Sequence, residues 1–268
     1  MIALPRRFVA LGDSFTEGVG DASAKLPNGV RGWADRVAER LAKHDPGWEY
    51  ANLAVRSKRL RQIVADQVPR ALELKPGLIT MYAGGNDILD VGTDVPRLMA
   101  DYGRAVAALT ATGARVLLFT GYDIPLVPAR ALFRGRNRLY NEAVRRIADE
   151  HGAEVVDFWA FDGLEDRGMW AADRLHLSKA GHKLVAAQVL DQLGVPHPWG
   201  APPPEPSVRR SIVEWERAQR RWAHDWVLPL LGRKIRRVTL GDDLRARFPD
   251  PVAVPRKGGL RRLPVPRP

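Results

Sequence analysis

The sequence predicts a three-layer α/β domain in which helices cover both faces of a parallel β-sheet. Apolar runs of strand length alternate with amphipathic runs of helix length from the N-terminus to about Val195. Several of the strand-length runs are rich in valine, isoleucine and leucine without polar alternation, which is typical of strands that are covered on both faces. Repeated strand–helix units of this kind form parallel sheets.

Five strands are expected, at Arg7–Leu11, Glu49–Leu53, Leu78–Ala83, Arg115–Thr120 and Glu154–Asp157. The helices between them are recognised by apolar residues that recur at helical spacing. The first helix is expected at residues 32–43. The others are centred on the apolar faces that run from Leu60 to Leu72, from Val95 to Leu109, from Tyr140 to Ile147 and from Leu184 to Leu193.

The composition is that of an ordinary globular protein. The 268 residues are 45% hydrophobic and 27% charged, which is enough to form a full-sized core. The absence of cysteine excludes disulfides, cysteine nucleophiles and thiolate metal sites. The first residues lack the apolar stretch of a secretory signal, and no run of about 18 apolar residues could span a membrane. A cytoplasmic location is therefore expected.

The net charge of +11 is concentrated in the C-terminal part of the chain. Residues 200–268 contain 16 Lys and Arg against 7 Asp and Glu, a net charge of +9, so residues 1–199 carry only +2. The basic charge therefore says little about the main domain, and no specific nucleic-acid partner is expected.

The chain is expected to divide into four parts. Residues 1–195 form the α/β domain, and the proline-rich residues 196–206 form an extended linker. Residues 207–231 form an amphipathic helix, and residues 232–268, rich in Arg, Pro and Gly, are poorly ordered. One face of the helix carries Val208, Ile212, Trp215, Trp222 and Trp226.

The favoured interpretation of this helix is that its tryptophan face packs against the main domain. The alternatives are self-association through that face and contact with an anionic surface through the arginines on the rest of the helix.

A serine follows the first expected strand. Gly12, Asp13 and Ser14 come directly after the apolar run Phe8–Leu11, so Ser14 lies where a buried strand opens into a loop at the edge of the sheet. That position suits a nucleophile. Ser14 and Glu17 also match the S-x-x-E pattern of a capping box, so the alternative is a serine that only caps a short helix.

Three other polar segments occupy matching places. Asn52–Ser57 follows the second strand, Gly84–Asp87 follows the third, and Asp173–His176 comes just before the last helix. Because ligands bind at the carboxyl ends of parallel strands, these segments are expected to meet Ser14 at one rim of the sheet.

Each residue type in these segments has a role in nucleophilic catalysis. His176 can take the serine proton and return it to a leaving alcohol, and Asp173 can hold the other ring N–H of His176. Donors for an oxyanion are available from the backbone N–H of Ser14, a backbone N–H near Ser57 and the side-chain amide of Asn86. Singly, Asn86 could belong to a turn and His176 could be an ordinary hydrogen-bonded histidine, but their joint occurrence favours a hydrolase.

With these motifs in this order, the chain resembles the SGNH (GDSL-type) hydrolase superfamily of esterases, lipases, thioesterases and carbohydrate deacetylases. The matching pieces are Gly12–Gly18, the G-x-N-D element Gly84–Asp87 and the D-x-x-H element Asp173–His176. The resemblance implies that Ser14 is the nucleophile, that Asn86 is an oxyanion donor, and that Asp173 and His176 complete the triad. It also implies a flavodoxin-like fold, no metal and no cofactor.

The sequence departs from the family pattern at two positions. Phe15 stands in place of the leucine of the G-D-S-L signature, an apolar exchange that leaves the chemistry intact. Where the family places a glycine whose backbone N–H enters the oxyanion hole, the nearest match is Ser57. A serine keeps the N–H, but dihedral angles that only glycine adopts easily would be strained there.

The predicted function is hydrolysis of small or medium acyl carboxylic esters through an acyl-enzyme, with a small-molecule ester as the partner. Asp13, Phe133 and Trp170 are expected to help line the substrate pocket, against the alternative that Phe133 and Trp170 only pack locally. An acyltransferase or thioesterase with the same triad is an alternative. A non-catalytic binding protein that acts through its basic tail is another.

Overall fold

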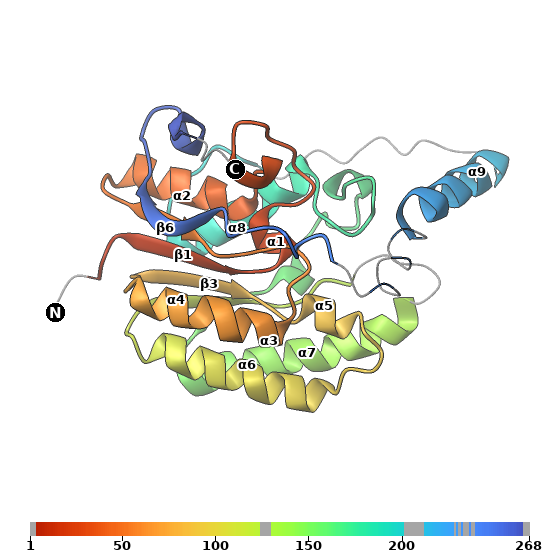
Figure 1. Ribbon diagram of the computed structural model, residues 1–268, viewed down its shortest axis with the longest axis horizontal. Coiled ribbons are helices and arrows are strands. Elements are labelled where there is room, and N and C mark those ends of the chain that lie inside the picture. Colours follow the sequence, from red (N-terminus) through yellow and green to blue (C-terminus); the bar gives the residue numbers. More distant parts are fainter. Residues whose placement is uncertain are drawn as a thin grey trace.

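The computed structural model describes residues 4–123, 130–200, 212–227, 229, 232, 236 and 239–264 (Figure 1). A six-stranded sheet lies at its centre, in the order β5-β4-β3-β1-β2-β6. The first five strands are parallel, and their order 2-1-3-4-5 is flavodoxin-like, as expected. The strands are β1 (Arg7–Gly12), β2 (Glu49–Asn52), β3 (Leu78–Tyr82), β4 (Arg115–Phe119), β5 (Glu154–Val156) and β6 (Phe248–Ala253).

Helices cover both faces of the sheet, which confirms the three-layer prediction (Figure 1). One face is covered by α2 (Trp33–His44) and α8 (Lys179–Leu193), whose side chains pack on Phe8 and Phe119. The opposite face carries α3 (Leu60–Gln62), a π-helical segment (Ile63–Gln67), α4 (Val68–Glu73), α6 (Val95–Thr110) and α7 (Arg130–His151). Two short helices, α1 (Ser14–Glu17) and α5 (Gly85–Ile88), follow β1 and β3.

The sixth strand comes from the C-terminal segment. Strand β6 pairs antiparallel with β2, with Ala253 opposite Glu49 and Val252 opposite Tyr50. The prediction of five strands is therefore short by one, and the prediction of a poorly ordered tail is wrong for residues 239–264. The two prolines of β6 are compatible with its place at the edge of the sheet, where one side of a strand makes no ladder hydrogen bonds.

A buried ion pair joins this segment to the main domain. Arg247 and Asp35 are both fully buried, and Arg247 Nη1 lies 2.8 Å from Asp35 Oδ2. The hydroxyl of Tyr50 donates to the same carboxylate at 3.0 Å. Because an unpaired charge at such a depth is strongly unfavourable, the pair fixes the path of the chain just before β6.

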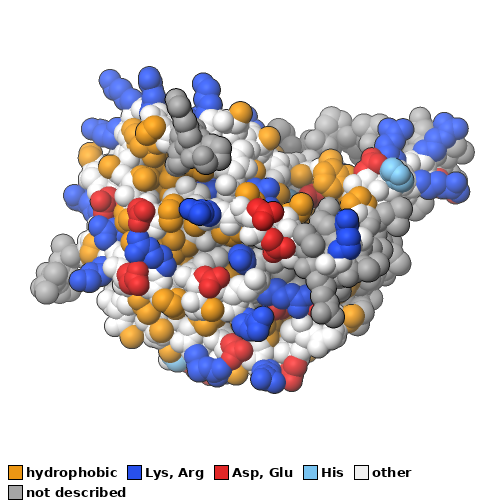
Figure 2. Space-filling view, viewed as in Figure 1, with side chains coloured by type: hydrophobic (Ala, Val, Ile, Leu, Met, Phe, Trp, Pro, Cys, Tyr) orange, Lys and Arg blue, Asp and Glu red, His pale blue; other side chains and the backbone are white. Residues whose placement is uncertain are grey.

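The predicted tryptophan-bearing helix is present as α9 (Ile212–Trp222) and continues into a π-helical turn at Ala223–Val227. It projects from the sheet domain (Figure 1), and exposed Arg217, Arg220 and Arg221 give it a basic surface (Figure 2). Residues 201–211, which include most of the predicted linker, lie outside the described residues. Within the described part of the chain, every helix is too short or too polar to cross a bilayer.

Candidate active site

The loop after β1 presents Ser14 at the first position of helix α1. Gly12, the last residue of β1, has φ of +150°, which favours glycine. A Cβ there would lie 2.6 Å from the carbonyl oxygen of Tyr82 on the neighbouring strand β3, so a larger residue does not fit. The side chain of Gln67 holds both the N–H and the carbonyl of Gly12, at 2.8 and 2.9 Å. Asp13 caps the helix by accepting the N–H of Phe15. The alternative in which Ser14 is the cap of a capping box is therefore wrong.

His176 and Asp173 lie in line with Ser14. The imidazole Nε2 of His176 is 3.0 Å from Ser14 Oγ, and its Nδ1 is 2.5 Å from Asp173 Oδ2. Asp173 Oδ1 accepts hydrogen bonds from the backbone N–H groups of Leu175 and His176, each at 3.0 Å. The carboxylate therefore stabilises the turn that connects Asp173 to His176. This arrangement allows a proton to pass from the hydroxyl to the imidazole.

The pKa of Asp173 is set by two opposing effects. Burial acts to raise it, but the hydrogen bond and the charge of His176, with the two backbone N–H groups, outweigh burial and hold the pKa below its usual value. Asp173 is therefore a carboxylate at neutral pH. A carboxylate in this position fixes the imidazole tautomer that leaves Nε2 free to accept a proton.

The two backbone N–H groups expected as oxyanion donors have no hydrogen-bond partner among the described residues. One belongs to Ser14, in the first turn of α1, where helical N–H groups lack partners within the helix. The other belongs to Ser57. The N–H groups on either side of it are used: Arg56 donates to Glu17, and Lys58 donates to Val55. The N–H of Ser57 therefore remains available to donate a hydrogen bond to a substrate.

Asn86 connects that loop to the serine. Its Nδ2 donates to the carbonyl of Lys58 at 2.9 Å and to Asp13 Oδ2 at 3.1 Å. Both amide hydrogens are used in this state, so a substrate oxygen receives one only when it replaces one of these acceptors.

Asp13 is a buried carboxyl beside the serine. Burial raises its pKa to about 7, although the N–H of Phe15 and the charge of His176 act in the opposite direction. Its two oxygens are taken by Phe15 and Asn86. Asp13 therefore sets the position of the Asn86 amide.

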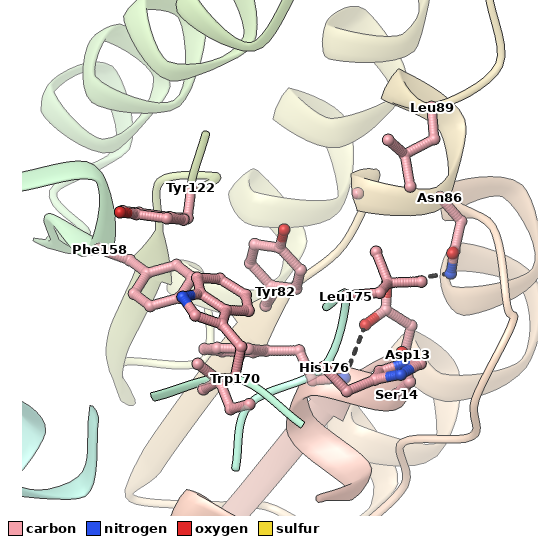
Figure 3. Close-up of a pocket in the computed structure, with 13 residues that line it drawn as sticks. Asp13, Ser14, Tyr82, Asn86, Leu89, Tyr122, Phe158, Trp170, Leu175 and His176 are labelled. Carbon is pink, nitrogen blue, oxygen red and sulfur yellow. Dashed lines mark hydrogen bonds between the residues drawn. The ribbon is translucent and has the colours of Figure 1, made fainter. Parts of the chain in front are cut away.

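Ser14 and His176 open into a cavity with an aromatic wall (Figure 3). Asp13, Asn86 and Trp170 also line this cavity. The ring centroids of Tyr122 and Trp170 are 5.2 Å apart, and those of Phe15 and Phe158 are 5.0 Å apart. The remaining lining residues are Tyr82, Gly85, Leu89, Leu175 and Leu177. An apolar pocket with a few polar groups at one end suits an acyl chain attached to a reactive carbonyl.

Comparison with known proteins gives the family. The model of the GDSL-like Lipase/Acylhydrolase family matches residues 10–184, more than half of the chain. The chain belongs to the GDSL-like Lipase/Acylhydrolase family. It is an ester hydrolase.

Individual relatives agree with this family. The chain is 25% identical over 189 residues to the GDSL esterase/lipase WDL1 of Oryza sativa subsp. japonica, an alignment that covers 59% of this chain and 69% of the relative. Its fold is similar to that of TesA, with a TM-score of 0.58, 23% identity, and coverage of 70% of this chain and 97% of that one. It is also similar to a catalytic mutant of Axe2, an acetylxylan esterase from Geobacillus stearothermophilus, with a TM-score of 0.60, 20% identity, and coverage of 71% and 94%.

Within this GDSL-type chain, the structure brings together most of the predicted site residues. Ser14, Asp13, Asn86, His176 and Trp170 line one cavity, with Asp173 behind the histidine. Phe133 lines an adjoining cavity that shares Tyr82, Gly85, Leu89 and Tyr122 with the first. Ser57 does not line either cavity and joins the site through its loop, whose Lys58 carbonyl holds Asn86.

Several aromatic residues of the pocket were not predicted from the sequence. Tyr82 ends β3, Tyr122 comes three residues after β4, and Phe158 comes two residues after β5. All three follow the strand-end rule that identified the polar residues, and a search of strand ends for aromatic side chains would find them. Among the described residues, no group of three or more His, Cys, Asp or Glu could hold a metal ion.

Proposed function

We propose that the protein hydrolyses small or medium acyl carboxylic esters through an acyl-enzyme on Ser14, with His176 as the base and Asp173 as its orienting carboxylate. The observation that supports this most directly is the line of hydrogen-bonding atoms from Ser14 Oγ to His176 Nε2, at 3.0 Å, and from His176 Nδ1 to Asp173 Oδ2, at 2.5 Å. A serine hydroxyl is a weak nucleophile without such a base.

In the acylation step, Ser14 Oγ attacks the ester carbonyl while its proton passes to His176 Nε2. The negatively charged carboxylate of Asp173 stabilises the imidazolium that forms. The tetrahedral intermediate then breaks its bond to the alcohol oxygen, and His176 returns the proton to that oxygen. The alcohol leaves, and the acyl group stays on Ser14 as an ester.

In the deacylation step, a water molecule takes the place of the alcohol. His176 removes a proton from the water, the resulting oxygen attacks the acyl carbonyl, and the second tetrahedral intermediate releases the carboxylic acid as Ser14 recovers its proton from His176. The enzyme returns to its starting state with one ester bond hydrolysed.

The oxyanion of both intermediates is stabilised by the N–H groups of Ser14 and Ser57 and by the amide of Asn86. The two N–H groups have no partner among the described residues, which makes them available as donors. Asn86 contributes by exchanging its bond to Asp13 for one to the substrate oxygen. Loss of one such donor lowers kcat by about two to three powers of ten.

The shape of the pocket favours a small or medium acyl group. Its aromatic wall is closed by ring contacts among Phe15, Tyr122, Phe158 and Trp170, which leave a compact cavity beside Ser14. The neighbouring cavity lined by Phe133 gives room for a somewhat longer chain.

The test is turnover of a p-nitrophenyl ester series from acetate to palmitate by the native chain, Ser14→Ala and a matched control, Ser23→Ala, which lies outside the cavity lining. We expect Ser14→Ala to lose nearly all turnover and all labelling by a fluorophosphonate, while Ser23→Ala keeps both. Equal turnover by the native chain and Ser14→Ala would overturn the proposal.

Two additions to this experiment separate the alternatives. Release of free acid in the presence of added alcohols supports a hydrolase, whereas transfer of the acyl group to the added alcohol supports an acyltransferase. Preference for acyl thioesters over matched oxygen esters supports a thioesterase.

A further inference from the structure

The C-terminal segment Thr239–Val254 contacts the loop that carries Ser57. A Cβ added to Gly241 would lie 2.0 Å from the carbonyl oxygen of Arg56, so the two backbones are in direct contact. Further along, β6 pairs with β2, the strand that leads into this loop. The segment starts well beyond residue 184, where the match to the family ends.

A buried carboxylate of helix α1 also holds this loop. Glu17, at the end of the helix that begins with Ser14, is fully buried. Its Oε2 accepts the backbone N–H of Arg56 at 2.7 Å and the Nε of the same residue at 2.9 Å, while Oε1 accepts Nη2 at 2.8 Å. The three bonds lock Arg56, the residue before Ser57, to helix α1.

Arg247 connects the C-terminal segment to the end of helix α1. Its guanidinium donates to the carbonyl of Glu17 at 2.8 Å and to the carboxylate of Asp35. The amide of Asn28 adds a second bridge, since it donates both to Glu17 Oε1 at 2.9 Å and to the carbonyl of Arg245 at 3.1 Å. The end of helix α1, the Ser57 loop and the C-terminal segment therefore form one hydrogen-bonded unit.

Ser57 needs such support because of its backbone conformation. Its φ is +67°, in the left-handed region. A residue with a Cβ is less stable there than glycine by about 1–2 kcal/mol. Without external constraints, Ser57 would relax toward negative φ and reorient its N–H.

We propose that Glu17, Arg247 and Gly241 are positioning residues that hold the Ser57 N–H in its left-handed orientation for the oxyanion, so that a serine serves where the family uses glycine. The inference rests on the proposed function, in which that N–H stabilises the tetrahedral intermediates. The C-terminal segment is then part of the catalytic unit through its contacts with Arg56, in addition to its place in the sheet.

The first test is a double-mutant cycle with Glu17→Gln and Ser57→Gly. Glu17→Gln keeps the shape of the side chain but removes the charge that holds Arg56. We expect kcat to fall about tenfold to hundredfold with KM nearly unchanged, since a displaced donor acts only on the intermediate. In the Ser57→Gly background the same substitution should lower kcat much less, because glycine keeps positive φ without strain. A purely structural role of Glu17 predicts equal losses in both backgrounds.

The second test addresses the C-terminal segment. Gly241→Ala places a methyl group against the carbonyl of Arg56, whereas the matched control Gly135→Ala, in helix α7, adds a methyl group that meets no atom within 4 Å. We expect Gly241→Ala to lower kcat about tenfold with KM unchanged, and Gly135→Ala to keep both values. If Glu17→Gln does not fold, Gly241→Ala decides alone.

The outcomes distinguish this inference from the proposed function. Turnover that depends on Ser14, together with an unchanged kcat in Gly241→Ala and no coupling between Glu17 and Ser57, overturns the positioning role and leaves the hydrolase mechanism intact. Turnover that does not depend on Ser14 overturns the proposed function first.

Discussion

The indole N–H of Trp222 donates a hydrogen bond of 3.0 Å to the backbone carbonyl of Asp173. The guanidinium of Arg174 lies over the same indole, 4.6 Å from the ring centroid, and also donates to Gln219 at 2.6 Å. Helix α9 therefore contacts the loop that connects Asp173 to His176. Trp222 makes this contact with the main domain, whereas Trp226, on the same predicted face, is exposed, so packing of the whole tryptophan face stays a prediction.

Loss of this hydrogen bond should change catalysis more than stability. Trp222→Phe keeps an aromatic face for Arg174 but leaves the carbonyl of Asp173 without its donor. We expect kcat to fall about threefold to tenfold, because small displacements of an orienting group act on the reacting geometry. The free energy of unfolding should change by only about 1 kcal/mol. Trp226→Phe, at an exposed tryptophan in the π-helical turn that follows α9, is the control. Equal effects of the two substitutions would contradict the prediction.

The five parallel strands were predictable because runs of strand length, most of them apolar, alternate with helical patterns, and the observed ends lie within one residue of the expected ones. Strand β6 was not. Its sequence, Phe248–Ala253, contains two prolines and carries no apolar alternation, so it gave no strand signal. Its pairing depends on the open edge of β2 and on the buried Arg247–Asp35 pair, neither of which leaves a local pattern.

The residues of the site were likewise predictable from the sequence, whereas the contacts that support them were not. Ser14, Asn86, Asp173 and His176 each follow a recognisable break in the chain, so their meeting at the rim could be inferred from the topology. The links among Glu17, Arg56 and Arg247 join residues up to 230 positions apart in the sequence, and charged residues of this kind normally lie on the surface. Only the folded structure brings these three together.

Trp170 should limit the length of the acyl chain. It is buried, it lines the cavity with Ser14, and its Nε1 donates to the carbonyl of Leu164 at 2.7 Å. Trp170→Leu removes part of the aromatic wall. We expect the ratio of kcat/KM for octanoate to that for acetate to rise about tenfold, because each methylene that finds room in an apolar pocket contributes about 1 kcal/mol.

Two further variants sharpen the test of chain length. Trp199→Leu, outside both cavity linings, should keep the native ratio. Phe133→Leu, in the adjoining cavity, should change the rates for longer chains and leave the rate for acetate unchanged. An unchanged octanoate-to-acetate ratio in Trp170→Leu would mean that Trp170 only packs locally.

Asp13 should make the stability of the protein depend on pH. Burial raises its pKa from the ordinary value of 3.8 to about 7. Between these values the folded state keeps a proton that the unfolded chain has released, so the contribution of this group to stability is complete below about pH 4 and is lost as the pH rises through 7. Ionisation of Asp13 above pH 7 opposes folding by on the order of 4 kcal/mol.

The measurement is the difference in free energy of unfolding between Asp13→Asn and the native chain, from urea unfolding at several pH values. Asparagine resembles the protonated carboxyl, so the variant should gain stability relative to the native chain as the pH rises from 4 to 8. Asp66→Asn, at an exposed position, measures the effect of losing a surface carboxylate. A constant difference between Asp13→Asn and the native chain over this range would contradict the raised pKa.

The two parts of the C-terminal extension should contribute very differently to stability. Ending the chain at residue 238 removes β6 and leaves Asp35 without Arg247, which alone lowers the free energy of unfolding by about 3–5 kcal/mol, because a buried charge loses its partner. Replacing residues 207–231 by Gly and Ser in equal number removes the Trp222 hydrogen bond, with an expected loss of about 1 kcal/mol. Urea unfolding of both variants at one pH compares them. Arg247→Met provides a milder change if the shortened chain does not fold. Equal losses in the two variants would contradict this prediction, and a larger loss on replacing α9 would make the tryptophan-bearing helix the main stabilising element of the extension.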